Sequence, residues 1–366
     1  MIRFIAFYLP QYHSIPENDK WWGKGFTEWV NVAKARPLFK GHRQPNIPAD
    51  LGFYDLRFEE TRIQQAEMAK EYGVDGFCYW HYWFGNGKRL LERPFEEILK
   101  SSKPDFPFCL AWANHSWEKK TWDSEGNSEL LIKQLYPGEQ DYINHFNTML
   151  PAFKDDRYMK VNGKLVFFIY NPLGSTEIPK FIQIWRDLAM SNNLNGFHFI
   201  AKDADSRNKD KIMELGMDAI YNDDVFNIHH YENVLKKFYY WFNRNFLHRP
   251  TTFLYKNAIK YMVTEKCRDN NVIPVIAPNW DHSPRSGSNG IILHKSNPKY
   301  FYKVINKAID IVKNKPQEEQ LIIIKSWNEW GEGNYLEPDM KFGTGNLEAL
   351  KRAITDSKIL RENESC

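Results

Sequence analysis

Two glutamates three positions apart give the chain its clearest chemical signal. Glu329 and Glu332 lie in SWNEWGEGNYLEPD, residues 326–339, directly after an apolar run. On a helical turn, the Cβ atoms of residues at this spacing stand about 5–6 Å apart. Two anions in one cavity repel each other, and this repulsion separates their pKa values. One acid and one carboxylate in the same site are what glycosyl transfer requires.

The structural alternative for this pair is a solvated acidic loop. Trp327, Trp330 and Tyr335 flank the glutamates and favour a site over such a loop. We interpret Glu337 differently, as a loop carboxylate that accepts hydrogen bonds from backbone amides before Pro338.

Eight short apolar, β-branched and aromatic runs predict eight strands. Near-continuous apolarity is typical of parallel strands that are covered on both faces. Amphipathic stretches between the runs predict helices, for example over 57–72, 139–153 and 301–313. Eight βα repeats favour an α/β fold of the (β/α)8 TIM-barrel type over a doubly wound open sheet, with one catalytic domain over 1–366. The runs are 3–9, 76–80, 107–113, 164–170, 196–201, 218–221, 273–277 and 321–327.

Side chains that suit a sugar follow these runs. The active site of a (β/α)8 barrel lies at the C-terminal ends of its strands. Aromatic faces there stack on the C–H faces of a sugar, while amide, phenol and carboxylate groups bind its hydroxyls. Taken singly, an aromatic residue at a strand end is more often part of the core, but their convergence on one rim favours binding. The candidate substrate-binding residues are Tyr8, Gln11, Tyr12, Trp29, His81, Tyr82, Trp83, Asn114, Trp117, Tyr170, Asn171, Trp280, Asp281, Asn328, Trp330 and Tyr335.

Two insertions interrupt the alternation of strands and helices. Residues 10–56 are rich in Trp, Pro and Gly and are far longer than an ordinary βα loop, which is typical of a segment that serves a site. The second insertion is 222–272, and from Tyr231 to Arg268 it carries eight Lys or Arg against two Glu. One interpretation is a surface for a membrane or polyanion, with peripheral membrane contact through 231–268. The other, which we favour, is a helical insertion whose aromatic side chains pack inward.

Composition excludes several classes of protein. Hydrophobic residues at 42% and charged residues at 26% argue against a disordered, fibrous or coiled-coil chain. A net charge of only +3 argues against nucleic acid as the partner. Cysteine spacing indicates buried thiols, or a tail for Cys366, and we expect no metal and no other cofactor. Because no signal peptide or transmembrane run is visible, we expect a cytoplasmic location. The cysteines are Cys78, Cys109, Cys267 and Cys366.

Five motifs are spread over nearly the whole chain: GFTEW (25–29), GHRQP (41–45), YGVDGFCYWHYWF (72–84), LAWAN (110–114) and WNEWGEG (327–333). Together they resemble the WbsX-like proteins, which are grouped with the family 99 glycoside hydrolases.

The resemblance implies a (β/α)8 barrel that hydrolyses α-linked poly- or oligosaccharide with retention and with substrate assistance. One Glu deprotonates the sugar's own 2-hydroxyl to give an anhydrosugar, and another serves as acid and then as base. Carried onto this chain, Glu329 is the base and Glu332 the general acid/base. The family motif has a His where this chain has Gly331, so the 1,2-linked mannan specificity is not carried over.

Proteins of this kind are often labelled glycosyltransferases of polysaccharide gene clusters. That label implies an alternative, a sugar-nucleotide-dependent transferase in bacterial surface polysaccharide (O-antigen or capsule) biosynthesis. Asp203-Ala204-Asp205 is a triplet able to hold a cation against a diphosphate, although a chance occurrence in a charged loop explains it better. A third alternative is a non-catalytic carbohydrate-binding barrel, which gives the glutamate pair no role.

Overall fold

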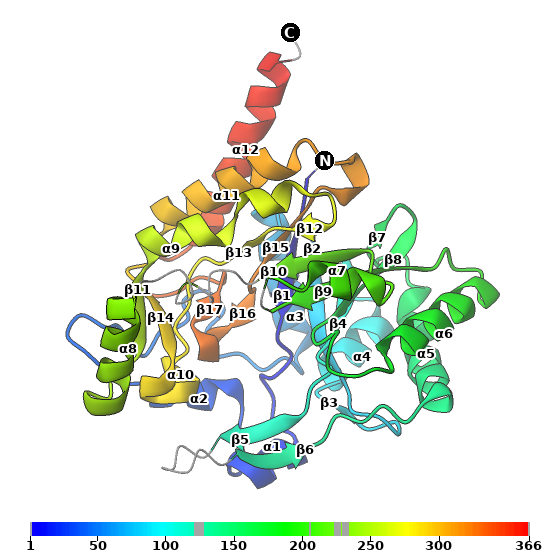
Figure 1. Cartoon of the computed structure of the whole chain (residues 1–366), viewed down its shortest axis with the longest axis horizontal. Helices are drawn as coiled ribbons and strands as arrows, with labels where there is room; N and C mark the ends of the chain where they lie inside the picture. Colours follow the sequence, from blue (N-terminus) through cyan, green and yellow to red (C-terminus); the bar gives the residue numbers. More distant parts are fainter. Residues whose placement is uncertain (1, 121–127, 205, 223–227, 229–233, 365–366) are drawn as a thin grey trace.

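Nine parallel strands form the main path of the eleven-stranded central sheet in the computed structural model, which describes residues 2–120, 128–204, 206–222, 228 and 234–364. The strand order is β12-β10-β9-β8-β4-β2-β1-β15-β13 (Figure 1). These strands are β1 (Arg3–Tyr8), β2 (Gly76–Trp83), β4 (Phe108–Trp112), β8 (Lys164–Ile169), β9 (Phe197–Asp203), β10 (Ala219–Asn222), β12 (Val272–Ile273), β13 (Val275–Ile276) and β15 (Leu321–Ile324).

The sheet closes into a barrel through one strand that Pro274 divides. On one side of the proline, Ile273 pairs with Tyr221 of β10, and on the other side Val275 pairs with Ile323 of β15. Proline has no N–H to give to a sheet ladder, so the strand is split into β12 and β13. Taken as one strand, they complete a ring of eight, which confirms the predicted (β/α)8 barrel and its eight strand runs.

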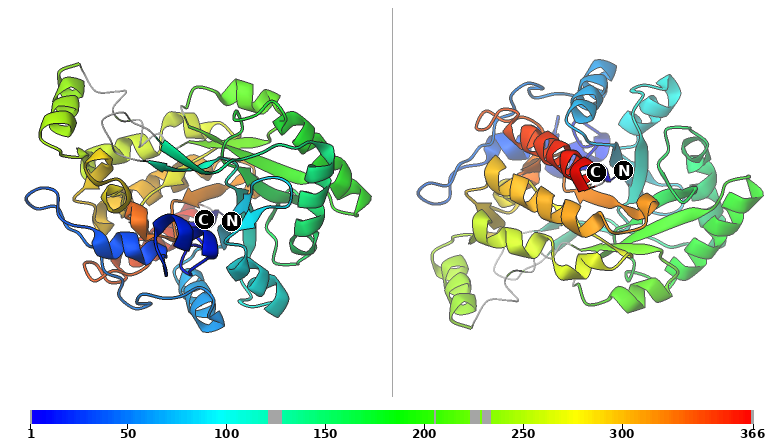
Figure 2. Two further views of the ribbon diagram at one scale, coloured as in Figure 1. Left: turned by 90° about the horizontal axis from the view of Figure 1, so that it is seen from below. Right: turned by 90° about the horizontal axis from the view of Figure 1, so that it is seen from above.

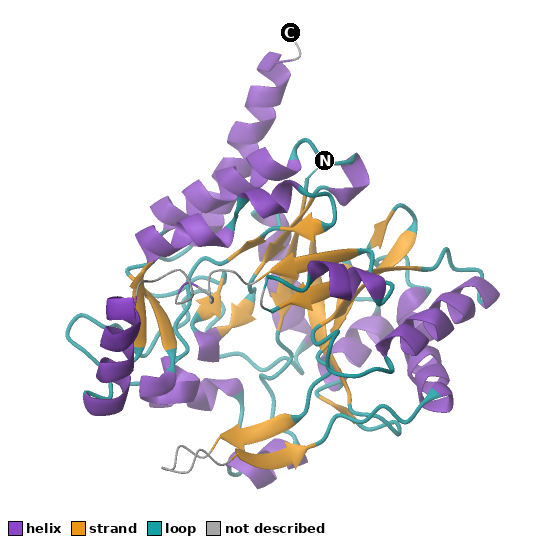
Figure 3. Cartoon of the chain, viewed as in Figure 1, coloured by secondary structure: helices purple, strands orange, loops and turns teal. Residues whose placement is uncertain are grey.

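Helices surround the sheet, as Figures 2 and 3 show. The helices predicted over 57–72, 139–153 and 301–313 are confirmed as α3, α5 and α11. In α11, Asn297 caps the first turn by accepting a bond from Tyr300 N at 3.2 Å, and Pro298 follows at the first helical position. The helices around the barrel are α3 (Glu59–Glu71), α4 (Arg93–Ser101), α5 (Glu139–Phe153), α6 (Ile178–Ser191), α7 (Lys209–Glu214), α9 (Tyr255–Met262), α11 (Pro298–Val312) and α12 (Gly345–Glu364).

The two insertions carry secondary structure of their own. Residues 10–56 contain α1 and α2, and 222–272 contain α8, β11, α9 and η2. Nowhere in the described ranges is there a helix long and apolar enough to cross a bilayer. The remaining elements are α1 (Pro16–Trp22), α2 (Glu28–Lys34), β3 (Arg89–Leu90), β5 (Trp117–Lys120), β6 (Ser128–Ile132), β7 (Lys160–Val161), α8 (Val234–Phe246), β11 (Thr251–Leu254), η2 (Glu265–Arg268), α10 (Ser283–Ser286), η3 (Gly287–Asn289), β14 (Ile291–His294), η4 (Gln317–Glu319), β16 (Asn328–Glu329), η5 (Trp330–Glu332) and β17 (Asn334–Tyr335).

Side chains of β2 alternate between the barrel interior and the layer of helices, as successive residues of a strand must. Trp80 and Tyr82 reach the open end of the barrel. His81 and Trp83 face the other way, and the Trp83 ring stacks on His145 of α5 with ring centroids 4.5 Å apart. This alternation decides which residues of the strand are available to a ligand.

Three of the four cysteines are buried free thiols, as the sequence predicts: Cys78, Cys109 and Cys267. Cys366 lies outside the described residues.

Candidate active site

A cleft of about 840 Å³ lies where the barrel strands end. Both predicted catalytic glutamates line it, together with polar and aromatic residues from four other strand ends and from the first insertion. The predicted site residues on its wall are Gln11, Tyr82, Asn114, Trp117, Tyr170, Asn171, Glu329 and Glu332.

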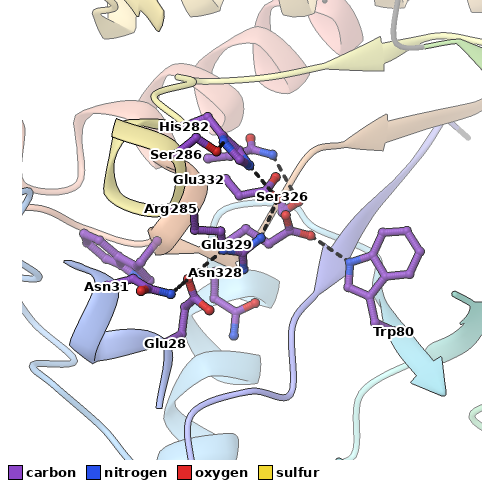
Figure 4. A network of polar contacts seen from close by, with 12 residues as sticks. Glu28, Asn31, Trp80, His282, Arg285, Ser286, Ser326, Asn328, Glu329 and Glu332 are labelled. Carbon is purple, nitrogen blue, oxygen red and sulfur yellow. Dashed lines mark hydrogen bonds and ion pairs between the residues drawn. The ribbon is translucent and has the colours of Figure 1, made fainter. Parts of the chain in front are cut away.

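The two glutamates stand on either side of one tight turn. Glu329 ends β16, and Glu332 ends the 3-10 turn η5 that follows. Gly333 must be glycine, because it has a φ of 54° and a Cβ there would lie 2.8 Å from the backbone nitrogen of Asp281. Figure 4 shows the two carboxyl side chains next to each other, with Trp80 beside Glu329 and Arg285 beside Glu332.

Glu329 is the protonated member of the pair at neutral pH. Burial raises its pKa to about 8, and the negative charge of Glu332 adds to the shift. Trp80 Nε1 donates a 2.7 Å hydrogen bond to Glu329 Oε1 and so fixes the direction of the carboxyl. The Trp80 ring is itself held by stacking on Phe7, with centroids 4.7 Å apart.

Glu332 is the ionised member. Burial opposes its ionisation, but Arg285 and His282 outweigh burial and hold the pKa of Glu332 well below its ordinary value. Arg285 Nη1 donates to Glu332 Oε1 at 2.5 Å, and His282 Nε2 lies 3.6 Å from the same oxygen. The pKa values are thus separated, as the spacing predicts, but in the opposite sense to the roles that the resemblance implies.

Glu28 is a third carboxyl in the cleft, and the sequence analysis missed it. Its Oε1 accepts from Arg285 Nε at 2.8 Å and from Asn31 Nδ2 at 3.2 Å, and the residue is only 1% exposed. Glu28 begins α2, where the helix N-terminus favours a negative charge. Arg285 therefore bridges two carboxyl side chains, Glu28 from the first insertion and Glu332 from the eighth strand end.

Gly331 leaves the space that Glu28 occupies. A Cβ at position 331 would lie 1.6 Å from Glu28 Oε1 and 3.2 Å from Arg285 Nε. No larger residue fits there while Glu28 is in place. This gives a physical reason for glycine at position 331, because a carboxyl group from another segment fills the place of a side chain.

Another part of the cleft wall combines the aromatic rings of Tyr170 and Trp80 with the amide groups of Asn114 and Asn171. Asn114 and Asn171 are joined by two hydrogen bonds, from Asn114 Nδ2 to Asn171 O at 2.8 Å and from Asn171 N to Asn114 Oδ1 at 2.7 Å. Tyr170 meets Trp80 edge to face, with centroids 5.6 Å apart. Flat faces and fixed polar groups thus line one cleft, which is the combination that carbohydrate binding needs.

The other predicted binding residues are not on this cleft wall. Tyr8, His81 and Trp83 sit on the alternate strand positions that face the helices. Tyr8 donates to Gln65 Oε1 at 2.6 Å, and His81 Nε2 lies 2.7 Å from His145 Nε2. Burial lowers the pKa of His81 to about 3, so this histidine is neutral. The residues away from the wall are Tyr8, Tyr12, Trp29, His81, Trp83, Trp280, Asp281, Asn328, Trp330 and Tyr335.

Several of these residues fasten the first insertion to the end of the barrel. Asp281 Oδ2 accepts from His42 Nε2 and from Gln44 Nε2, both at 2.7 Å. The Tyr12 hydroxyl donates to the backbone oxygen of Asn328. These contacts hold the insertion in position, and with it Glu28 of the active-site network.

A second group of side chains, around Trp330 and Glu337, holds the turn η5 in place. Trp330 stacks on Tyr335 with centroids 3.7 Å apart. Glu337 accepts from Trp330 Nε1 at 2.6 Å, Gln65 Nε2 at 2.7 Å and the Tyr54 hydroxyl at 2.9 Å. The expectation that backbone amides bind Glu337 is therefore wrong, because its partners are side chains. Burial raises the pKa of Glu337 to about 7.

Asp203 of the acidic triplet is not among the residues that line the cleft. Asp203 is buried at the end of β9, and its Oδ2 accepts from Asn208 N at 3.0 Å. Asp205 lies outside the described residues. Within the described ranges, no group of three or more His, Cys, Asp or Glu is arranged to hold a metal ion.

Comparison with known proteins assigns the chain to a protein family. The model of the family described as "Glycosyltransferase WbsX" matches residues 4–350. Two curated relatives from two strains of Xanthomonas campestris pv. campestris, both described as "Uncharacterized protein WxcX", are 35% identical over 358 residues. Those alignments cover 96% of this chain and 49% of each relative, so the chain spans about half the length of the curated relatives it matches.

Solved structures share the fold. A GH99 endo-alpha-mannosidase from Bacteroides thetaiotaomicron superposes with a TM-score of 0.59 and 16% identity over 98% of both chains. A "Glycoside hydrolase-like protein" gives a TM-score of 0.60 and 16% identity over 96% of this chain and 93% of its own. With the family model matching nearly the whole chain, this protein belongs to the WbsX family.

Proposed function

We propose that this protein is a carbohydrate-active enzyme, a retaining glycoside hydrolase that acts on α-linked poly- or oligosaccharide. The observation that carries the proposal is the pair Glu329 and Glu332, two carboxyls in one aromatic-lined cleft with their pKa values pushed apart. Near pH 7 the pair holds one proton and one negative charge. Glycoside cleavage uses such a pair, because the leaving oxygen must gain a proton while a base acts on the other side of the reaction.

The proposed reaction is substrate-assisted. A carboxylate takes the proton of the sugar's 2-hydroxyl, and that oxygen attacks the anomeric carbon to form a 1,2-anhydrosugar. The bond to the leaving oxygen breaks as the acid protonates it. Water then opens the anhydrosugar at the anomeric carbon, giving one proton to the former acid, while the 2-oxygen regains its own proton from the former base. Two inversions give net retention, and both carboxyls return to their starting states.

The electrostatics of the free protein favour Glu329 as the acid and Glu332 as the base. Arg285 donates to Glu332 and stabilises its anion, so Glu332 is the ionised carboxylate that is available to act as the base. Within the described residues Glu329 accepts its hydrogen bond from Trp80 Nε1 and not from an arginine, and burial, which outweighs the more distant charge of Arg285, keeps this carboxyl protonated. This assignment reverses the one that the resemblance implies, and the leaving-group dependence given in the Discussion decides between them.

A screen of defined bacterial polysaccharides tests the proposal. We expect a reducing sugar released with retained configuration, and loss of turnover in Glu329→Gln and Glu332→Gln with glycan affinity kept within about tenfold. If neither wild-type protein nor variants turn over any glycan yet all bind one with equal affinity, the barrel is a binding protein and the proposal fails.

The description of the matched family favours one second candidate, a sugar-nucleotide-dependent glycosyltransferase of bacterial surface polysaccharide synthesis. Calorimetry with nucleoside diphosphates and Mn²⁺ separates the two candidates. Metal-dependent binding that is lost in Asp203→Ala would support the transferase. Because Asp203 is buried and bonded to Asn208 N, away from the cleft wall, we expect no such binding.

A further inference from the structure

Helix α8 turns its apolar face away from the protein. Phe238 and Phe246 are 61% and 60% exposed, whereas Asn243 is 8% exposed and faces inward. Tyr240, half-buried beside it, packs on Phe253 of β11 with ring centroids 5.2 Å apart. A helix that only covers a barrel has the opposite arrangement, with its polar side in water. The expectation that the aromatic residues of this insertion pack inward therefore holds for Tyr240 but is wrong for Phe238, Trp241, Phe242 and Phe246.

The exposed rings form one continuous patch, which we call the α8 aromatic face: Phe238, Trp241, Phe242 and Phe246. Phe238 contacts Trp241 with centroids 5.7 Å apart, and Trp241 contacts Phe246 at 5.6 Å. Phe242 and Phe246 stack at 5.1 Å. Val234 and Leu235, 80% and 79% exposed, extend the apolar surface. Single exposed apolar residues are common, but a contiguous patch marks a binding surface.

The positive charge of the segment that contains α8 indicates what kind of partner this face binds. Residues 234–264 contain six Lys or Arg and no Asp or Glu. Arg244 on α8 and Arg249, three residues after the helix ends, are both exposed. Pairing this face with a second copy of the chain would bring two such cationic segments together, which like-charge repulsion opposes. An anionic bilayer surface satisfies both features, because it buries apolar rings and attracts Lys and Arg.

We propose that α8 docks this protein on anionic lipid bilayers, with the aromatic face at the boundary between headgroups and acyl chains. The position of α8 suits membrane docking, because the helix projects from the edge of the molecule (Figures 1 and 2). β11 follows α8 and pairs with β14 from Thr251 to Leu254, and β14 in turn follows α10, which carries Arg285. The inference does not depend on the proposed catalytic function.

Vesicle flotation tests the docking. The intact protein should float with vesicles of phosphatidylcholine and phosphatidylglycerol, should do so less as salt rises, and should not float with phosphatidylcholine alone. Replacing Phe238, Phe242 and Phe246 together by Ser should weaken binding about tenfold or more. The matched control is Phe58→Ser, a phenylalanine elsewhere that is also 61% exposed, and it should bind as the wild type does.

A charge variant covers the case in which the triple variant fails to fold. Arg244→Glu with Arg249→Glu keeps the aromatic face and should also lose flotation with anionic vesicles, since it replaces two positive charges that such a surface attracts by two negative ones. Circular dichroism and thermal unfolding check the fold of each variant. Three results would overturn the proposal: no flotation of the wild type, equal flotation with neutral vesicles, or a dimer in light scattering that the triple variant abolishes while no vesicle binds.

Discussion

Replacing Glu329 with Gln should remove a pH dependence of stability that this buried carboxyl imposes. Glutamine has nearly the shape of a protonated carboxyl but cannot ionise. In the folded protein, burial and the charge of Glu332 raise the pKa of Glu329 from the ordinary 4.5 to about 8. The folded state therefore binds this proton more tightly than the unfolded state. The stabilisation is complete below the unfolded pKa and is lost as the pH rises to the folded one.

The magnitude follows from the size of the shift. From about pH 5 to about pH 8, roughly three pH units lie inside the window, and each is worth about 1.36 kcal/mol. The unfolding free energy of the wild type should therefore fall by about 4 kcal/mol over this interval because of Glu329. Glu329→Gln should not show this fall. Urea unfolding followed by circular dichroism across the pH range measures the difference between the two proteins.

Glu332→Gln is the internal control, because the sign for Glu332 is opposite. Its pKa is lowered below 4.5 by Arg285, so it contributes stability above that value and loses it as the pH falls. The variant should be less stable than the wild type near neutral pH, where it leaves Arg285 without one of its two carboxylates. Parallel stability curves for the wild type and Glu329→Gln from about pH 5 to about pH 9 would refute the reasoning about Glu329.

Three further predictions concern the contacts of the pair. Gly331→Ala should lower the unfolding free energy by about 1–3 kcal/mol, because its Cβ would lie 1.6 Å from Glu28 Oε1. Adding Glu28→Ala should remove most of that cost. If the effects of the two substitutions on the unfolding free energy are strictly additive, the two side chains do not compete for the same space. Glu329→Gln should lower kcat/KM for glycosides with poor leaving groups far more than for activated ones; the same pattern in Glu332→Gln would transfer the acid role to that residue. Trp80→Phe keeps an aromatic ring but removes the indole N–H that donates a hydrogen bond to Glu329. Initial rates should show kcat/KM reduced about tenfold. An unchanged kcat/KM would argue against a role for this hydrogen bond.

The barrel could be predicted because its strands carry a strong local signal. Each run of apolar residues must be covered on both faces, and this requirement is visible within a few residues, as in 164–170. The position of the glutamate pair followed from the end of the eighth run. Glu28 could not be found in this way, since it follows no strand run and Arg285, its partner, is 257 residues away; its place in the GFTEW motif was the signal that could have marked it.

Part of the binding wall was predictable and was missed. Tyr82 and Trp80 lie two apart on β2 and both reach the cleft, so alternation along the strand would have selected Trp80 in place of His81. Alternation gives no guidance for Tyr12 or Asp281, because they lie in irregular segments beyond the strands. Their side chains bind other loops, and only the folded chain brings those loops together.

Helix α8 was misread because amphipathicity tells which side of a helix is apolar but not what covers it. The sequence predicts the helix and its apolar face. Packing inward is the usual outcome, and here Asn243 takes the inward position while Phe238 stays exposed. The bilayer docking proposed for α8 would account for such an arrangement, because it covers the exposed rings with a surface outside the chain.

The central claim is that Glu329 and Glu332 together cleave a glycosidic bond within one cleft. Proton NMR of the first product released from a polysaccharide substrate tests it most directly, with the variant that carries both Glu329→Gln and Glu332→Gln run in parallel. We predict a product of retained anomeric configuration from the wild type and none from the double variant. An inverted first product, or turnover that survives the loss of both carboxyls, would contradict the claim.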